Sequence, residues 1–261
     1  MNESDLTRAV KEQYASSDNL DIRITIHEKY SINRQGFANW IAQHYSFFSG
    51  ASVLELGCGT GSFWRDQPDL INACDPLILS DFSAGMLQTA GETLKQYPSI
   101  RYRQIDIQDI PFPDRSFDFV IANMMLYHVP DPDKGLREVR RVLKPGGIFY
   151  CATYGENGIM DYLCGMFSKY GVSDKVNHTF TLQNGTKVLE RYFTAVRRED
   201  YPDALAVTHV EDLADYVYSL SGMSALRELD RETLISEFNA RTVDGVLNIP
   251  KEYGMFIASG E

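Results

Sequence analysis

A glycine-rich run, Glu55-Leu56-Gly57-Cys58-Gly59-Thr60-Gly61, ends a short apolar segment of the chain. Glycine lacks a Cβ atom, so such a run permits a tight turn and lets the backbone approach a ligand closely. Its spacing is G-x-G-x-G and differs from the G-x-G-x-x-G of dinucleotide-binding turns. Because many turns between a strand and a helix use glycine for geometry alone, this run by itself is weak support for a ligand site.

Two aspartates follow the run at regular intervals. Asp81 opens the segment Asp81-Phe82-Ser83-Ala84-Gly85-Met86-Leu87, and Asp106 opens Asp106-Ile107-Gln108-Asp109-Ile110-Pro111-Phe112. A carboxylate about twenty residues beyond such a glycine turn can accept hydrogen bonds from both hydroxyls of a ribose. A carboxylate at the second position can accept one from an adenine amino group. The alternative for each is a carboxylate that merely caps a helix or a turn.

An alternation of apolar runs and amphipathic segments accounts for this spacing. Short apolar runs predict buried strands at 51–56, 77–81, 100–105, 117–122 and 148–153. Strands that alternate with helices build right-handed βαβ units and a parallel sheet. The glycine-rich run and both aspartates then lie at the carboxyl ends of strands, where open α/β sheets bind their ligands.

Two helix starts between these strands are marked by capping residues. Ser83 precedes a segment with Met86 on its apolar face, and its hydroxyl is suited to cap that helix. Asp131 followed by Pro132 predicts a second start, and residues 144–147 (Lys-Pro-Gly-Gly) end that helix.

The flanking segments show weaker patterns. Apolar residues at helical spacing predict helices at 35–48, 156–170, 184–193, 210–220 and 224–240. Residues 194–201 and 252–258 read as strands. No boundary separates an independent unit, so we expect one domain over 1–261.

Four motifs in this order resemble those of class I S-adenosylmethionine-dependent methyltransferases, in the ubiquinone/menaquinone-biosynthesis-like group that acts on small molecules. The matching segments are V-L-E-L-G-C-G-T-G (53–61), D-F-S-A-G-M-L (81–87), D-I-Q-D-I-P-F-P-D-R-S-F-D (106–118) and E-V-R-R-V-L-K-P-G-G (138–147). The resemblance implies an α/β, Rossmann-like fold with helices on both faces of a seven-stranded, mostly parallel sheet whose last strand is antiparallel. The segment 252–258 fits that last strand.

The resemblance also implies roles for single residues in holding S-adenosyl-L-methionine, whose product is S-adenosyl-L-homocysteine. Glu55 and Gly57 would line the methionine end, although Glu55 could instead only satisfy amides of the loop. Asp81 would hold the ribose.

Further roles concern the adenine and the rest of the cofactor. The Asp106 carboxylate would accept a hydrogen bond from the adenine amino group, and the Ile107 backbone N–H would donate one to a ring nitrogen. Phe82 would lie against the adenine ring. The remaining contacts implied in this stretch come from Cys58, Gly59, Met86 and Asn123.

The segment 20–30 is ambiguous. Isoleucine alternates with other residues at 22, 24 and 26, which is a strand pattern, whereas the resembling enzymes form a helix here that caps the cofactor. We predict the helix. Tyr14, Arg23, His27 and Tyr30 could close over the cofactor, with an arginine paired to its carboxylate; the alternative is a surface ion pair or a packed aromatic residue.

The expected layout follows from these assignments. A helical cap (1–48) precedes the cofactor-binding core (51–154), and a closing strand (252–258) completes the sheet. Two segments, 155–182 and 202–247, would cover the substrate. They contain or border many aromatic and methionine side chains, which favours a small apolar or aromatic acceptor: Tyr154, Tyr162, Met166, Phe167, Tyr170, Phe180, Tyr216, Tyr218 and Met223. The alternative is that many of them are core residues.

The implied reaction is methyl transfer to an oxygen, nitrogen or carbon atom, which requires an in-line arrangement of the reacting atoms. His128 follows the fourth strand and is the candidate base or substrate-orienting residue, because imidazole titrates near neutral pH. The alternative is a structural histidine. The segment 123–128 lacks the Asn/Asp-Pro-Pro-Tyr/Phe signature of resembling enzymes that methylate nucleic-acid or glutamine amino groups.

The amino-acid composition disfavours some classes of binding partner. Lys and Arg number 25 and Asp and Glu 36, for a net charge of −11, which argues against nucleic acids and anionic membranes. The four cysteines form no C-x-x-C, so no metal site is expected. With no signal-like or membrane-spanning run, we expect a cytoplasmic protein.

Two other functions remain to be weighed. A non-catalytic regulatory module that binds S-adenosylmethionine is the alternative to an enzyme. An NAD(P)-dependent oxidoreductase is disfavoured by the glycine spacing. The sequence identifies neither the acceptor nor the oligomeric state.

Overall fold

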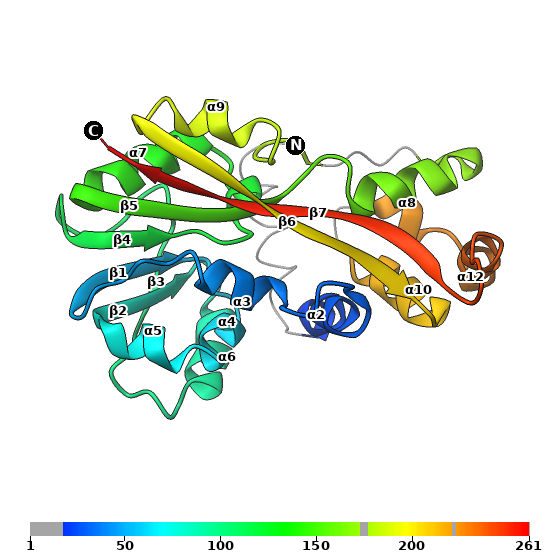
Figure 1. Ribbon diagram of the computed structural model, residues 1–261, viewed down its shortest axis with the longest axis horizontal. Coiled ribbons are helices and arrows are strands. Elements are labelled where there is room, and N and C mark those ends of the chain that lie inside the picture. The colour runs from blue at the N-terminus through cyan, green and yellow to red at the C-terminus, as the bar shows by residue number, and fades with distance from the viewer. Residues whose placement is uncertain (1–17, 173–176, 221–222, 261) are drawn as a thin grey trace.

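A seven-stranded sheet organises the chain in the computed structural model, which describes residues 18–172, 177–220 and 223–260 (Figure 1). Tyr14 lies outside these ranges. The strand order is β3-β2-β1-β4-β5-β7-β6, with β7 antiparallel to both of its neighbours. The strands are β1 (Ala51–Leu56), β2 (Cys74–Asp81), β3 (Arg101–Gln104), β4 (Phe117–Ile121), β5 (Leu143–Tyr154), β6 (Ala195–Val207) and β7 (Leu247–Ser259). The predicted fold class is therefore confirmed.

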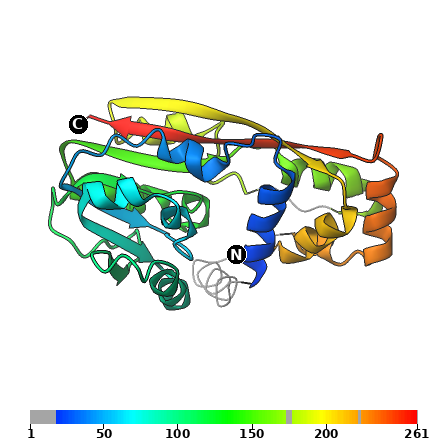
Figure 2. The same ribbon diagram turned by 60° about the horizontal axis from the view of Figure 1, so that its bottom comes forward.

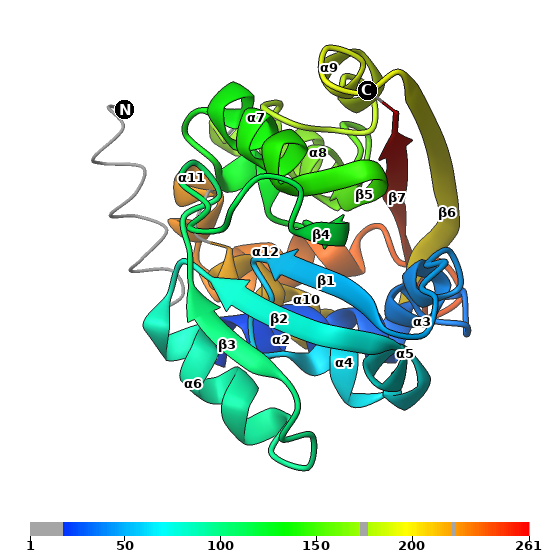
Figure 3. The ribbon, with the colours of Figure 1, turned by 90° about the vertical axis from the view of Figure 1, so that its left-hand side faces the viewer.

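Helices cover both faces of this sheet because successive residues of a strand point to opposite sides. Every residue of β1 is buried. Leu54 and Leu56 face α7 (Pro132–Val142) and α9 (Gly185–Leu189), whereas Val53 faces the opposite layer. The opposite layer contains α3 (Phe37–Ala42), α4 (Ser62–Arg65), α5 (Pro68–Ala73) and α6 (Ala84–Thr93) (Figure 3). Burial on both faces explains why the strand reads as a continuous apolar run.

Both predicted helix caps are present. The Ser83 hydroxyl accepts a hydrogen bond from the Met86 backbone N–H at the start of α6. The Asp131 carboxylate accepts one from the Lys134 N–H at the start of α7, where Pro132 occupies the first turn. Each cap fixes the direction in which the chain leaves a carboxyl end of the sheet.

The antiparallel pair β6 and β7 is longer than the segments 194–201 and 252–258 predicted. The two strands remain paired from Ala195 opposite Ser259 to Val207 opposite Leu247. Residues 202–207, assigned to a substrate-covering segment, therefore belong to the sheet.

The extra length supports a second hydrophobic cluster. Leu205 and Val207 of β6 and Leu247 and Ile249 of β7 pack there against five helices. These helices are α2 (Asp18–Tyr30), α8 (Ile159–Phe167), α10 (Val210–Ser219), α11 (Ser224–Arg227) and α12 (Arg231–Asn239). Figure 2 shows α2, in blue, between the parallel strands and the gold and orange helices at the far end of the pair.

The predicted helix at 35–48 ends at Ala42. Beyond it the chain turns, and its aromatic side chains pack on the sheet without helical structure. The Tyr45 ring lies 4.7 Å from that of Tyr150, and the Phe47 ring lies 4.8 Å from that of Phe119. The helical spacing thus predicted the helix correctly only as far as Ala42; Tyr45 is buried without helical structure, and Phe48 is exposed.

Other helices differ in length from the prediction. The segment 224–240 is divided into α11 and α12, and 184–193 contains only the short α9. The segment 156–170 contains α8 and a short 3-10 turn, η2 (Ser168–Tyr170). The predicted helix in 20–30 is confirmed as α2, because Ile26 and Tyr30, one turn apart, are both buried in the second cluster.

Candidate functional site

The loop after β1 has the backbone geometry that only glycine adopts easily. Gly57, Gly59 and Gly61 have positive φ angles of 74°, 56° and 72°. A Cβ atom on Gly57 would lie 2.9 Å from the Cβ atom of Met125, in the loop after β4. The glycines therefore permit both the turn and a close approach of the loops at the carboxyl edge of the sheet.

Asp81, the last residue of β2, joins two of these loops. Its Oδ2 atom accepts a hydrogen bond from the Gly59 N–H over 3.0 Å, and its Oδ1 atom accepts one from the Ser83 N–H over 2.8 Å. Burial raises the pKa of this carboxyl, and the backbone N–H donors oppose that rise. The carboxylate is thus held rigidly beside the glycine-rich loop.

Glu55 is an almost fully buried acid, with 3% of its surface exposed. Its Oε2 atom accepts a hydrogen bond from the Trp64 indole N–H over 2.5 Å. Burial raises the pKa of Glu55 to about 7, although the indole donor favours the charged form; the nearby Asp81 charge adds to the rise. A buried acid with a pKa near neutrality gains charge readily when a cation binds beside it.

Asp106 lies in the loop after β3, where a residue that sequence reasoning missed contacts it. The Gln108 side-chain amide lies 3.2 Å from each Asp106 carboxylate oxygen, and the Gln108 backbone N–H donates to Oδ1 over 2.9 Å. Ile107 is buried against Gly135 in the first part of α7. In the sequence, the one feature that could have indicated this contact is a side-chain amide two residues after the aspartate.

The loop after β4 contains Asn123 and the 3-10 turn η1 (Leu126–His128). The Asn123 side-chain amide donates to the Tyr45 hydroxyl over 2.7 Å, and its Oδ1 atom is buried with no hydrogen-bond partner among the described residues. Burial lowers the pKa of His128 to about 4, and the positive charge of Arg23 contributes. His128 is therefore neutral at physiological pH.

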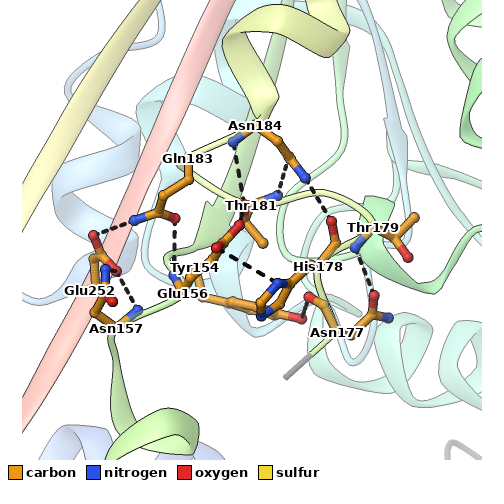
Figure 4. Close-up of polar contacts among 10 residues, drawn as sticks. All are labelled: Tyr154, Glu156, Asn157, Asn177, His178, Thr179, Thr181, Gln183, Asn184 and Glu252. Atoms are coloured by element: carbon orange, nitrogen blue, oxygen red, sulfur yellow. Dashed lines mark hydrogen bonds and ion pairs between the residues drawn. The ribbon is translucent and has the colours of Figure 1, made fainter. Parts of the chain in front are cut away.

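A polar network surrounds the end of β5 (Figure 4), and one of its members, Asn177, also contacts η1. The Tyr154 hydroxyl donates to the Asn177 carbonyl oxygen over 2.8 Å, and the Asn177 side-chain amide donates to the Tyr127 carbonyl oxygen over 2.6 Å. Nearby, Glu156 Oε2 lies 3.7 Å from Nδ1 of the exposed His178. Asn177 thus links the last residue of β5 to the residue immediately before His128.

Another part of the same network joins the loop after β5 to β7. The Asn157 backbone N–H donates to one Glu252 carboxylate oxygen over 2.8 Å, and the Gln183 amide donates to the other over 2.7 Å. Gln183 also accepts a hydrogen bond from the Glu156 backbone N–H over 3.0 Å. These contacts fix the segment around residue 183 against the sheet.

One face of α2 meets this edge of the sheet. The His27 Nε2 atom lies 3.2 Å from the Tyr253 hydroxyl of β7, and the His27 ring centroid lies 6.2 Å from that of Tyr216 in α10. Burial lowers the pKa of His27 to about 3, with the charge of Lys251 adding to the shift. Its Nδ1 atom is buried without a hydrogen-bond partner in the described ranges.

Arg23 lies one turn before His27 on α2, so the two side chains share a face. The Arg23 Nε atom donates to the Asn19 carbonyl oxygen over 3.0 Å. Its positive charge acts on His128, Tyr216 and Tyr253. Arg23 therefore lies within electrostatic reach of the loop after β4.

The Tyr30 hydroxyl does not point to the same partners as Arg23 and His27. Its hydroxyl donates to the Asp212 carboxylate of α10, which also receives a hydrogen bond from Lys29 over 2.6 Å. The ring is buried in the second cluster. Tyr30 therefore binds α2 to α10, and its assignment as a cofactor contact is corrected.

Three further residues expected to contact the cofactor lie close to the glycine-rich loop and Asp81. Cys58 and Met86 are buried, and burial raises the pKa of the Cys58 thiol well above its usual value. Phe82 is half-buried directly after Asp81. Their positions suit packing around a ligand at this edge.

Several of the nine aromatic and methionine residues expected to line a substrate pocket are core residues. Four of them are buried within the hydrophobic clusters: Met166, Phe167, Phe180 and Met223. The prediction of a pocket lining is wrong for these four, because burial in a core and burial in a pocket leave the same composition. Tyr216 is buried too, but it contacts His27.

The described residues contain no group of three or more His, Cys, Asp or Glu side chains arranged to hold a metal ion. In the same ranges, no helix combines the length and the apolar character needed to cross a membrane.

Comparison with known sequences identifies the domain at this edge. Residues 54–151 match the family described as methyltransferase domain. A demethylmenaquinone methyltransferase of Lysinibacillus sphaericus is 30% identical over 127 residues, which are 49% of this chain and 54% of the relative. The ubiquinone/menaquinone biosynthesis C-methyltransferase UbiE of Hahella chejuensis is 38% identical over 102 residues, 38% of this chain and 41% of the relative. The chain thus spans about half, or less, of the length of these curated relatives.

Solved structures share the fold at lower identity. The YcgJ protein of Bacillus subtilis has a TM-score of 0.61 at 19% identity, covering 86% of this chain and 98% of its own. A phosphoethanolamine N-methyltransferase 2 of Haemonchus contortus, solved with S-adenosyl-L-methionine, has a TM-score of 0.62 at 19% identity, covering 97% of this chain and 59% of its own. The matched segment, residues 54–151, and the sheet order together identify a class I S-adenosylmethionine-dependent methyltransferase domain in this chain.

Proposed function

We propose that this chain binds S-adenosylmethionine at the carboxyl edge of β1, β2 and β3 and transfers its methyl group to a small molecule. The observation that carries this proposal is the link between Asp81 and Gly59, which sets a carboxylate beside a glycine-rich loop. A carboxylate so placed suits both hydroxyls of a ribose. Two observations fit the cofactor itself: the buried Oδ1 atom of Asn123 lacks a donor among the described residues, and a Cβ atom would crowd the turn at Gly57.

The methionine end of the cofactor would lie near Glu55, Gly57 and Asn123. The Glu55 carboxylate and the Asn123 carbonyl oxygen are acceptors suited to an ammonium group. Arg23, on the face of α2 that approaches His128, suits the carboxylate. Glu55 would then be charged when the ammonium group is present, because a neighbouring cation favours the ionised acid.

The adenine would lie near the loop after β3. Asp106 would accept a hydrogen bond from the amino group, the Ile107 backbone N–H would donate to a ring nitrogen, and Phe82 would contact the ring face. Cys58, Gly59 and Met86 would pack along the nucleoside.

Calorimetry with S-adenosylhomocysteine tests this part of the proposal. The unmodified chain should bind it, and Asp81→Asn should weaken binding about 100-fold, since a carboxylate that contacts two hydroxyls contributes two charge-assisted hydrogen bonds. Asp109→Asn is the matched control, because Asp109 is exposed in the neighbouring loop. Binding of NADH without binding of S-adenosylhomocysteine would refute the proposal.

We further propose that the acceptor binds where α2, η1, α10 and β7 meet. We call His27, His128, Tyr216 and Tyr253, which come from these four elements, the acceptor group. The group offers imidazole and phenol side chains on ring-rich walls, in which Tyr216 is buried and the other three are partly buried. The buried Nδ1 atom of His27 has a hydrogen-bonding capacity that a polar acceptor would satisfy. A small molecule with at least one polar atom fits these walls, and the net charge of −11 disfavours a nucleic acid.

When bound, S-adenosylmethionine supplies a methyl group already activated by its sulfonium. The chain must therefore orient the acceptor atom in line with that group, which is the main source of acceleration in such a displacement. His128 is neutral, so its imidazole can accept a hydrogen bond from the acceptor and orient it. Its pKa of about 4 makes it a weaker base than the near-neutral titration of an ordinary imidazole led us to expect. Asn177 holds its loop through the Tyr127 carbonyl oxygen.

A screen of small acceptors with methyl-labelled S-adenosylmethionine tests this second part. His128→Ala should leave binding of S-adenosylhomocysteine almost unchanged and lower turnover by about 100-fold, in line with the cost of a misplaced acceptor. His209→Ala is the control, because His209 is exposed beside α10. Unchanged turnover in His128→Ala would remove this residue from the chemistry, and binding without transfer to any acceptor would favour a regulatory module.

A further inference from the structure

Gln108 donates hydrogen bonds to both oxygens of the Asp106 carboxylate. Its backbone N–H and its side-chain amide donate to Oδ1 over 2.9 Å and 3.2 Å, and the same amide donates to Oδ2 over 3.2 Å. Contacts to both oxygens restrict rotation of the carboxylate about its bond to the Cβ atom. The plane of the Asp106 carboxylate is therefore determined by its neighbour two residues later.

Gln108 is itself held by the start of α7. The backbone N–H of Asp131 donates to Gln108 Oε1 over 3.1 Å. Asp131 is the N-cap of α7 and is fixed by accepting the Lys134 N–H. This contact decides which end of the Gln108 amide faces Asp106, because the reversed amide would direct its oxygen at a carboxylate and its NH₂ group at an N–H.

The loop is also anchored by packing. Ile107 is buried, and a Cβ atom on Gly135 would lie 3.2 Å from its Cγ1 atom. The absence of a side chain at Gly135 thus allows α7 to approach the loop closely. Backbone, amide and apolar contacts together make residues 106–108 a rigid unit docked on the first part of α7.

The Asp106 carboxylate can accept a further hydrogen bond. A carboxylate oxygen has two lone pairs, and the Gln108 amide is the donor to Oδ2 within the described part of the chain. We propose that Gln108 is a positioning residue that aims Oδ2 of Asp106 at the amino group of the adenine, and so sets the preference for adenine over a base with a carbonyl oxygen at that position. This inference rests on the proposed binding of S-adenosylmethionine.

Calorimetry of the full chain with two ligands tests the inference. S-adenosylhomocysteine presents the amino group, and S-inosylhomocysteine presents a carbonyl oxygen in its place. The unmodified chain should prefer the first ligand by at least about tenfold, since the second sets an acceptor against the carboxylate. In Gln108→Leu, the affinity for S-adenosylhomocysteine should fall about tenfold while that for S-inosylhomocysteine changes little. The ratio of the two affinities should therefore become smaller than in the unmodified chain.

A second variant separates the amide from the size of the side chain. Gln108→Glu keeps the length and an acceptor for the Asp131 N–H, but it sets a second carboxylate against Asp106, so it should lose at least as much affinity for S-adenosylhomocysteine. Gln88→Leu is the matched control, because the exposed Gln88 amide donates to the Glu92 carboxylate on the outside of α6; it should bind both ligands as the unmodified chain does.

The outcomes distinguish this inference from the function on which it depends. If Gln108→Leu weakens both ligands equally, or binds S-adenosylhomocysteine more tightly, Gln108 does not position the carboxylate and the inference is overturned. If the unmodified chain binds neither ligand, the proposed function itself fails.

Discussion

The Trp64 indole N–H donates to Glu55 Oε2 over 2.5 Å, in a position where the acid is almost completely removed from water. Burial opposes the charged form, and a single neutral donor only partly offsets that effect. Glu55 is therefore poised between its two protonation states near pH 7, before any ligand is considered.

Glu55 should make the ligand-free chain less stable as the pH rises. Its folded-state pKa of about 7 exceeds the ordinary value of 4.5, so its favourable contribution is fully present below pH 4.5 and is lost as the pH rises through 7. In Glu55→Gln, the free energy of unfolding at pH 8 should rise by up to about 3 kcal/mol. Urea denaturation at pH 4.5 and pH 8 measures this, and equal stability of both chains at pH 8 would contradict it. The same variant should bind S-adenosylhomocysteine more weakly.

Gly57→Ala should destabilise the chain. The positive φ angle disfavours a side chain, and the new methyl group would meet Met125 at 2.9 Å, so we expect a loss of about 2–4 kcal/mol in urea denaturation. Gly91→Ala is the control: Gly91 lies within α6 with open space around it, and alanine there should gain about 0.5–1 kcal/mol. A neutral effect at Gly57 would show that the two loops can separate.

Lys251 and Asp203 form an ion pair between β7 and β6 whose side chains are only 1% and 0% exposed, with Nζ 2.6 Å from Oδ2. Lys251→Met should lower the free energy of unfolding by about 3–5 kcal/mol, because it leaves a buried carboxylate without its cation. The double variant Lys251→Met/Asp203→Asn should recover part of this loss. A single variant as stable as the unmodified chain would mean that water or another group replaces the cation.

Removing the Arg23 charge should change the titration of His128. Burial is the larger cause of its lowered pKa of about 4, and the guanidinium adds to it. In Arg23→Met the pKa of His128 should therefore move upward, since loss of a nearby positive charge favours the protonated ring. NMR titration of the histidine Cε1 protons measures this shift. An unmoved His128 would place Arg23 too far away to matter.

The parts of the fold that the sequence predicted correctly are those specified by neighbouring residues. Ala51–Leu56 is a continuous apolar run because both faces of β1 are covered, and Ser83 and Asp131 cap helices through bonds to residues three positions later. The error at 35–48 has a different origin, since Tyr45 is buried, and Phe47 partly buried, by contact with distant strands. Local periodicity cannot distinguish that burial from a helix.

The candidate site was predictable to the same extent. Glu55 and Asp81 lie at the carboxyl ends of their strands and Asp106 follows a third strand, so sequence order alone brought them to one edge. His27 and Tyr253 are 226 positions apart and Asp203 and Lys251 are 48 apart, so no local pattern could pair them. Gln108 is local, yet a glutamine in a loop has no distinctive pattern until the Asp131 N–H is known to face it.

The place of β7 in the sheet has a consequence for synthesis of the chain. β7 is formed by Leu247–Ser259 but inserts between β5 and β6, pairing with both. A ribosome releases segments in order, so β5 and β6 emerge well before the strand that joins them. Until β7 arrives, one edge of β5 and the partner-facing edge of β6 lack their hydrogen-bonding partner, and such edges promote aggregation. The nascent chain can thus assemble β1 to β5 early, whereas the second cluster must wait for the last strand.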